Sequence, residues 1–231
     1  MFLFPINRVP DEMNHARMTW ETIHKQTENS FKWMDEIPSN DKVKPREYKQ
    51  LLARKIEMKN EPFKVGISLK TISFLPQLIG MTIGSWISHS VGMIIYMGRI
   101  FNALAYILGL YFLIRYFKYG KTALMFISLL PIMVQQASSL SYDVMNYLEV
   151  MLAIGFITNL AYSKRFTNRN FVQVIGLAIL LLATKPNNFL LLGLIPFVSF
   201  EFKGVLKVLN RPFKSLKIIV SRYKFVFYFL L

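Results

Sequence analysis

The last 161 residues of the chain contain almost no acidic side chains, and this feature constrains the fold more than any other. Residues 71–231 hold 15 Lys and Arg but only three acids, Asp143, Glu149 and Glu201, whereas residues 1–70 hold 13 basic and 10 acidic side chains. Soluble domains carry about 25% charged residues, so the acid-poor stretch indicates a multi-span membrane protein. The net charge of +15 would suggest a nucleic-acid binder in a soluble chain. Here membrane topology explains it better, and no nucleic-acid partner is expected.

Apolar runs after position 70 have the length of membrane-crossing helices, which need about 17–25 residues. They predict an all-α fold, a polytopic transmembrane helical bundle with about five spans. The expected spans lie near 89–114, 122–138, 143–162, 170–184 and 187–201, with a partial span at 225–231. The run at 74–87 is short for a span and predicts an interfacial or re-entrant helix.

The two adjacent runs 170–184 and 187–201, each of 15 residues, allow either one kinked helix or a two-span hairpin. Cytoplasmic loops collect Lys and Arg, and 13 of the 15 basic residues after position 70 lie in loops 115–121, 164–169 and 203–224. A single helix would place neighbouring basic loops on opposite sides of the membrane. The hairpin is therefore favoured, with all three basic loops on the cytoplasmic side.

Residues 1–73 are expected to form a long extracytoplasmic loop with amphipathic helices, before a transmembrane region over 74–231. This side assignment holds if 74–87 does not span; if it spans, the loop is cytoplasmic, and its 13 basic residues fit that alternative too. The first residues, MFLF, are too few to cross a bilayer, and the chain stops inside the apolar run FVFYFLL. We therefore expect the chain to be part of a longer protein.

A cluster of polar residues near the N-terminus is the first candidate site. Asp11, Glu12 and His15 follow Pro10, and on a helix Asp11 and His15 lie four residues apart on one face. A carboxylate beside an imidazole can act as a base or bind a metal. The competing interpretation is a helix cap with a surface histidine, because Asp is a common N-cap residue.

Three charges in the membrane region form the second candidate set, since ionisable groups at membrane depth are costly and usually functional. Arg99 lies well inside its apolar run, where its guanidinium fits either a phosphate or a structural ion pair with Asp143 or Glu149. Asp143 stands at the outer start of a helix, where it or Ser141 could cap the helix instead. Lys185 lies at an outer turn and suits an anionic head group or an interfacial position.

Several classes of chemistry lack their sequence signatures. The chain has no Cys, which excludes thiol catalysis, Cys-bound zinc and disulfides. It also lacks the phosphate-binding motif G-x-x-x-x-G-K-[ST], the zinc motif H-E-x-x-H and the hydrolase motif G-x-S-x-G. Nucleotide-driven transport and these hydrolases are therefore disfavoured.

Five short pieces of the sequence together carry a family resemblance. They are VPDEMNHA (9–16), LPQLIGMTIG (75–84), GRIFNALAYIL (98–108), LLPIMVQQASSLSYD (129–143) and ATKPNN (183–188). In this order they resemble the bacterial domain-of-unknown-function 2142 family of polytopic membrane proteins. That family is grouped with the C-type glycosyltransferases, which use sugars carried on polyprenyl phosphate.

The resemblance implies a multi-pass protein of the bacterial cell (plasma) membrane that transfers a sugar from a polyprenyl-phosphate carrier to a cell-envelope glycan acceptor. Asp11 would be the catalytic acid in the first external loop, with Glu12 and His15 beside it. Arg99, Asp143 and Lys185 would bind the lipid phosphate or substrate, although their roles do not transfer individually. No cofactor is required; a divalent metal, which some relatives bind, is compatible with Asp11, Glu12 and His15.

Two alternatives to an active enzyme stay open. One is a non-enzymatic membrane transporter or a subunit of a polysaccharide-export machine, whose intramembrane charges line a path or bind lipid. The other is an inactive truncated fragment, because the chain lacks the first helix and most of the later helices of the family pattern.

Overall fold

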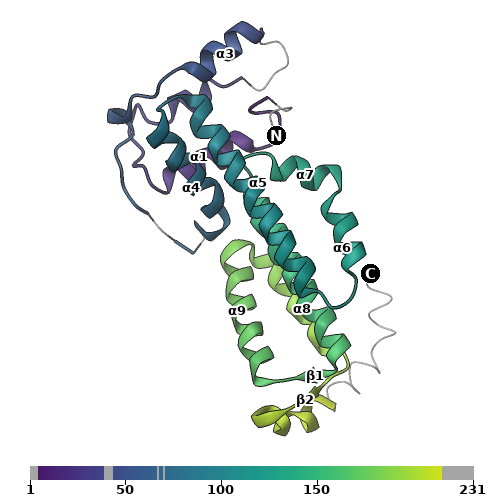
Figure 1. The fold of residues 1–231 in the computed structure, drawn as a ribbon. Coiled ribbons are helices and arrows are strands. Elements are labelled where there is room, and N and C mark those ends of the chain that lie inside the picture. The colour runs from purple at the N-terminus through teal and green to yellow at the C-terminus, as the bar shows by residue number, and fades with distance from the viewer. Residues whose placement is uncertain (1–4, 39–43, 67, 70, 215–231) are drawn as a thin grey trace, which may run out of the picture. The chain divides into compact units, whose positions relative to one another are not determined.

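The computed structural model describes residues 5–38, 44–66, 68–69 and 71–214, and these residues are mainly helical (Figure 1). The chain divides into two compact units. The first unit comprises residues 1–114 and 122–148, and the second comprises residues 115–121 and 149–231. The expected partial span at 225–231 lies outside the described residues. The units are described one at a time below.

Among the described residues, eight helices precede α8 (Asp143–Ser163) in the first unit or in the loop that leads back to it. They are α1 (Glu12–Glu21), α2 (Lys32–Asp35), α3 (Pro45–Ala53), the 3-10 helix η1 (Met58–Asn60), α4 (Thr71–Ile87), α5 (Val91–Tyr116), α6 (Lys121–Ser128) and α7 (Pro131–Ala137). The N-terminal region shares one apolar core with α4 and α5, in which Trp20 and Phe31 are buried with Met81 and Ile94. The charged first third of the chain is thus packed on the apolar helices.

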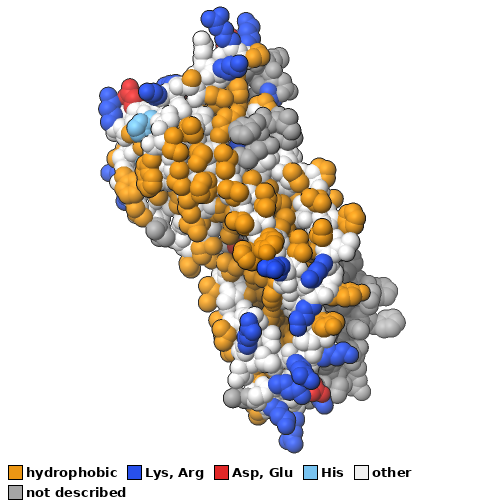
Figure 2. All heavy atoms as spheres, viewed as in Figure 1, with side chains coloured by type: hydrophobic (Ala, Val, Ile, Leu, Met, Phe, Trp, Pro, Cys, Tyr) orange, Lys and Arg blue, Asp and Glu red, His pale blue; other side chains and the backbone are white. Residues whose placement is uncertain are grey.

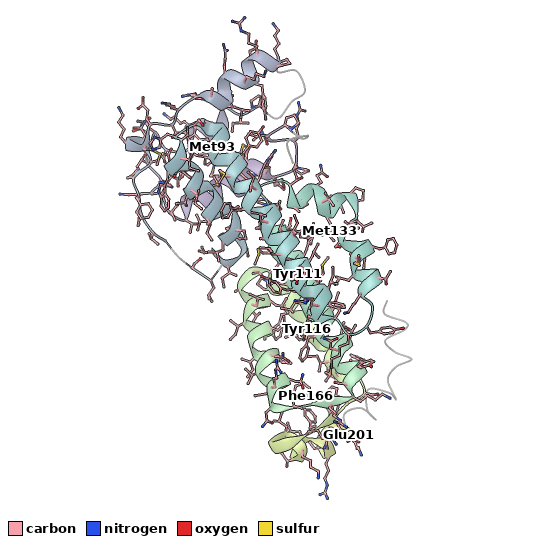
Figure 3. All side chains as sticks on the ribbon, viewed as in Figure 1. Met93, Tyr111, Tyr116, Met133, Phe166 and Glu201 are labelled. Carbon is pink, nitrogen blue, oxygen red and sulfur yellow. The ribbon has the colours of Figure 1, made fainter. Side chains whose placement is uncertain are left out.

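Close packing of α4 on α5 depends on glycines. A Cβ on Gly80 would lie 2.3 Å from the carbonyl oxygen of Met97, and one on Gly84 would lie 2.8 Å from that of Met93, which Figure 3 labels on α5. Neither distance is possible for a real side chain. Small residues allow the two helix backbones to approach in this way, as they do in membrane proteins.

Two helices among the described residues, α5 and α8 (Asp143–Ser163), are long and apolar enough to cross a membrane. α5 also exposes large apolar side chains, as a helix in contact with lipid does. They include Leu104, Ile107, Leu108 and Phe112. Spans near 89–114 and 143–162 are therefore supported by the helix bounds, whereas five spans are not confirmed.

The expected span over 122–138 is wrong as a single helix. α6 ends at Ser128, Leu130 adopts an extended conformation, and α7 begins at Pro131. The residue before a proline is pushed out of the helical region, and proline has no N–H to continue the helix ladder. Neither α6, with 8 residues, nor α7, with 7, can cross a bilayer alone.

The second unit contains the end of α8 and a helical hairpin. Its other elements are β1 (Arg165–Phe166), α9 (Asn168–Thr184), the 3-10 helix η2 (Pro186–Phe197), β2 (Glu201–Phe202) and the 3-10 helix η3 (Gly204–Leu209). β1 precedes the hairpin and pairs with β2, which follows it; Figure 3 labels Phe166 and Glu201 on these strands. Lys and Arg side chains gather around the two strands (Figure 2).

The chain reverses direction between α9 and η2, as the hairpin prediction requires, but both arms are shorter than the candidate spans, so their crossing of the membrane stays a prediction. α9 packs along η2. β2, which follows the hairpin, pairs with β1, which precedes it, so the hairpin begins and ends at the same place. At rises of about 1.5 Å per residue in α9 and about 2.0 Å in η2, the two arms have nearly equal lengths of about 25 Å. A capping box, in which Thr167 and Asn170 bond reciprocally, starts α9.

Candidate functional site

A buried ion pair joins α1 to α5 at the centre of the first unit. Arg99 Nε donates to Glu12 Oε1 and Arg99 Nη2 donates to Glu12 Oε2, each over 2.7 Å, and both side chains are 0% exposed. Bidentate pairs of this kind are the strongest and most directional that proteins form. The structural alternative for Arg99 is therefore the one observed, and the partner that the structure shows is Glu12.

Glu12 also holds two backbone segments. Its Oε1 accepts from the Leu140 amide over 3.1 Å, and its Oε2 accepts from the Asn7 amide over 2.8 Å. Arg99 Nη2 donates in addition to the Pro5 carbonyl over 3.2 Å. Each carboxylate oxygen of Glu12 thus accepts two hydrogen bonds. The geometry suits Glu12 to positioning the surrounding segments, and it leaves Glu12 without access to a substrate.

Asn102 fixes the segment that leads into α8. It lies three residues after Arg99 on α5, and its Nδ2 donates to the carbonyls of Ser139 and Ser141 over 2.8 and 2.9 Å. The Ser141 hydroxyl in turn accepts from the Asp143 amide over 3.2 Å, as expected for a residue that caps a helix start. Residues 139–143 are therefore held by the same face of α5 that holds Glu12.

Asp11 is exposed at the start of α1. Its carbonyl accepts from the His15 amide over 2.9 Å, so it stands at the N-cap position, but its side chain makes no capping bond. Its backbone is left-handed, with φ 60°, and its Oδ1 accepts from Asn14 Nδ2 over 3.2 Å. The N-cap interpretation is thus right for the backbone only, and the carboxylate remains at the surface.

His15 is buried one turn after Asp11. Its side chain is 7% exposed, Nδ1 has no hydrogen-bond partner, and its ring packs edge-on against Tyr142 at 4.5 Å between centroids. Burial lowers the pKa of His15, and the charges of Asp143, Asp11 and Glu12 oppose this shift. The imidazole is consequently favoured in its neutral form, which can accept a proton or a hydrogen bond.

Five of the six predicted site residues belong to the first unit, and Lys185 belongs to the second. Of the N-terminal cluster, Glu12 contacts Arg99 directly, and the charges of Asp143, Asp11 and Glu12 act on His15. Lys185 ends α9 as its C-cap residue.

Sequence reasoning did not select Asn102 or the Leu140 amide. A signal for Asn102 exists, because an amide side chain three residues after Arg99 interrupts an otherwise apolar run. Nothing in the sequence marks the Leu140 backbone amide as a hydrogen-bond donor to Glu12. Within the described residues, no group of three or more His, Asp or Glu side chains could hold a metal ion.

Comparison with known proteins gives one match. A family model described as "Predicted membrane protein (DUF2142)" matches residues 1–228, nearly the whole chain. No curated protein and no solved structure matches the chain.

Proposed function

The chain belongs to the DUF2142 family of predicted membrane proteins, and on that premise we propose that it is a membrane glycosyltransferase. It transfers a sugar from a polyprenyl-phosphate carrier to a cell-envelope polymer, in the bacterial plasma membrane, as a multi-pass protein. The observation that carries the proposal is the placement of Asp11. An exposed carboxylate stands next to a fully buried ion pair that fixes the start of its helix.

Asp11 is the general base in this proposal. A hydroxyl of the acceptor gives its proton to an Asp11 oxygen while its own oxygen forms a bond to the anomeric carbon of the donor sugar. The bond between that carbon and the phosphate oxygen breaks, and polyprenyl phosphate leaves with the electron pair. A positioned general base contributes about 10²–10⁴-fold to such a rate.

The other residues have supporting roles. The Glu12–Arg99 pair positions Asp11, since Glu12 follows it directly and cannot move without breaking four hydrogen bonds. Neutral His15, one turn along α1, packs against Tyr142 and helps to hold the start of the helix, and Asp143 tunes its charge state. Lys185 is proposed as a ligand for an anionic lipid head group, for which its positive charge suits it.

The test is the variant Asp11→Asn in cells that depend on this gene for their envelope glycan. Removing the base should abolish the glycan while an immunoblot shows unchanged protein. Asp35→Asn is the matched control, because Asp35 is also an exposed acid of the N-terminal region and pairs only at the surface with Arg17. Normal glycan in the Asp11→Asn strain would refute the assignment.

A transporter or export-machine subunit is the second candidate, and Glu149 favours it. This carboxylate is buried in α8, where Oε2 accepts from the Thr184 hydroxyl and Oε1 has no hydrogen-bond partner. Acidic groups inside membrane helices often line transport pathways. Reconstituted vesicles separate the two candidates: movement of substrate without sugar transfer would support transport, and sugar transfer would support the enzyme.

A further inference from the structure

A basic pocket lies in the second unit beside the two paired strands β1 and β2, which Figure 1 labels at one end of α9. Its volume is about 570 Å³, within the range of small-molecule sites. The charged part of its lining consists of Lys164, Arg165, Glu201, Lys203 and Lys214. The residues with a role in the proposed sugar transfer lie elsewhere in the chain.

Positive charge dominates this lining. Among the described residues that line the pocket, four are basic and one, Glu201, is acidic, which leaves an excess of three positive charges. Lys203 Nζ donates to Glu201 Oε2 over 3.0 Å. This hydrogen bond and the charges of Lys203 and Lys214 hold the pKa of Glu201 below its ordinary value. The acid therefore neutralises one cation only, and the remaining positive charge attracts an anion.

The backbone brings two separate segments to this pocket. α8 ends at Ser163, and Lys164 turns the chain in a left-handed conformation with φ 53°. The Lys164 carbonyl accepts from the Glu201 amide over 3.1 Å, and Arg165 stands opposite Glu201 in the strand pairing. Because side chains alternate along a strand, Arg165, Glu201 and Lys203 lie on one face of the pair. The charges of both segments thus converge at one place.

Phenylalanine rings form the apolar part of the pocket. Phe200 and Phe213 belong to its lining, and their ring centroids lie 4.7 Å apart. Phe166 stacks on Phe200 at 5.2 Å, and both rings are buried in the apolar core of the hairpin. Cations next to aromatic rings suit an anionic group that is joined to an apolar one.

The outer surface of α9 indicates where such a ligand comes from. Large apolar side chains are exposed along one face of this helix, at Phe171, Val172, Ile175, Ile179 and Leu182. In a membrane protein a face of this kind contacts lipid. The face begins six residues after Arg165, so the basic pocket lies at its end. Basic pockets at the membrane surface bind the head groups of anionic lipids.

We propose that this pocket binds the phosphate head group of an anionic membrane lipid. The phosphate oxygens accept from Lys164, Arg165 and Lys214, and the apolar part of the lipid nearest the phosphate packs on Phe200 and Phe213. Both segments of the pocket belong to basic loops, so the topology expected from the sequence places this lipid in the cytoplasmic leaflet. Binding of the lipid requires a membrane protein but not sugar transfer.

Lipid binding is measured by native mass spectrometry on the full chain purified in a neutral detergent. The probes are phosphatidylglycerol, phosphatidylcholine with the same acyl chains, and inorganic phosphate. We expect phosphatidylglycerol to bind about tenfold more tightly than phosphatidylcholine, because its head group carries a net negative charge. An excess of inorganic phosphate should not displace the lipid, since free phosphate has no apolar part to pack on the phenylalanine rings.

The variants Lys164→Asn and Arg165→Gln should each weaken phosphatidylglycerol binding about fivefold, the contribution of one basic residue near a charged membrane surface. Asn suits position 164, because it adopts a left-handed backbone more readily than most residues. Lys207→Gln, on η3 outside the pocket lining, is the matched control and should change the affinity less than about twofold. Thermal unfolding checks every variant, and Lys214→Gln, at an exposed position outside the strands, decides the result if the other two do not fold.

Equal affinities for the two lipids would overturn the proposal. An equal loss in Lys207→Gln would also overturn it, because the total basic charge of the loops would then explain the binding. Displacement of the lipid by inorganic phosphate would assign the pocket to free phosphate instead. Asp11→Asn should keep full lipid affinity, so failure of the lipid site and failure of the catalytic assignment are separate results.

Discussion

Arg99 and Glu12, 87 residues apart in the sequence, form a fully buried bidentate ion pair with both N···O distances at 2.7 Å. Through this pair and the Leu140 amide, three of the sequence pieces that resemble the family converge on one carboxylate. The pair explains why adjacent acids differ in role. All hydrogen bonds of the Glu12 carboxylate hold other parts of the fold, whereas the Asp11 carboxylate lies at the surface.

Removing one partner of this pair should strongly destabilise the protein. Glu12→Ala removes the carboxylate that pairs with buried Arg99, and breaking a buried ion pair in this way costs about 3–5 kcal/mol. The double variant Glu12→Ala/Arg99→Met should recover part of this loss, because it removes both charges. The free energy of unfolding in detergent, measured with denaturant, checks both values.

The exposed pair Arg17–Asp35 is the control for this comparison, with side chains 39% and 67% exposed. Asp35→Ala should cost at most about 1 kcal/mol, because water solvates the remaining charge. Equal losses for Glu12→Ala and Asp35→Ala would show that burial of the central pair contributes nothing.

The sequence predicted that Arg99 needs an anionic partner, but it did not predict which residue supplies it. Its depth in an apolar run marks a charge that needs a partner, and Asp143 and Glu149 are the acids of the same region. The true partner lies in a segment that reads as a polar external loop. No sequence periodicity reports that such a loop folds back on a membrane helix, since this contact depends on tertiary packing.

Helix bounds were predictable where one apolar run makes one helix, as for α5 and α8. In the run over 122–138 the sequence does mark the break at Pro131, since proline cannot continue a helix ladder, but the length of the run alone predicts one span. The hairpin of α9 and η2 could be predicted from the distribution of charges alone. Its second arm, a 3-10 helix, could not, since apolar periodicity does not distinguish it from an α-helix.

Replacing glycine by alanine should lower stability at the α4–α5 crossing, where a methyl group clashes, and should not lower it on an open helix surface. Gly80→Ala places a methyl group 2.3 Å from the Met97 carbonyl oxygen, and relieving this clash should cost about 1–3 kcal/mol. Gly176→Ala on α9 meets nothing within 4 Å and should stabilise the protein by up to about 1 kcal/mol. Thermal unfolding of both variants in the same detergent measures the difference, and a shift of the same sign in both would contradict the close crossing.

Acidification should destabilise the first unit through His15. Burial lowers the native pKa of His15 below 6.5, so the unfolded chain binds more protons at this site between the native pKa and pH 6.5. Stability therefore rises with pH through this window and is lost as the pH falls. His15→Gln should flatten that slope, measured as the free energy of unfolding at several pH values.

Asp143→Asn adds a second readout for His15. The Asp143 charge opposes the effect of burial, so removing it should lower the His15 pKa further, as followed by NMR of the imidazole protons. His89→Gln is the control for the His15→Gln variant of the pH experiment, because it removes an exposed imidazole instead of a buried one. A pKa of His15 that rises in Asp143→Asn would contradict this electrostatic account.

Single-cysteine labelling should place the N-terminal region outside the cell. α4 has 17 residues and a length of about 26 Å, less than the hydrocarbon core of about 30 Å, which favours a helix that does not cross. Because the chain has no Cys, Glu47→Cys on α3 and Lys121→Cys at the start of α6 each give one thiol. A membrane-impermeant maleimide should label position 47 in intact cells and position 121 only after permeabilisation. Labelling of position 121 alone in intact cells would invert the topology, and it would also remove Asp11 from the side on which envelope polymers are built.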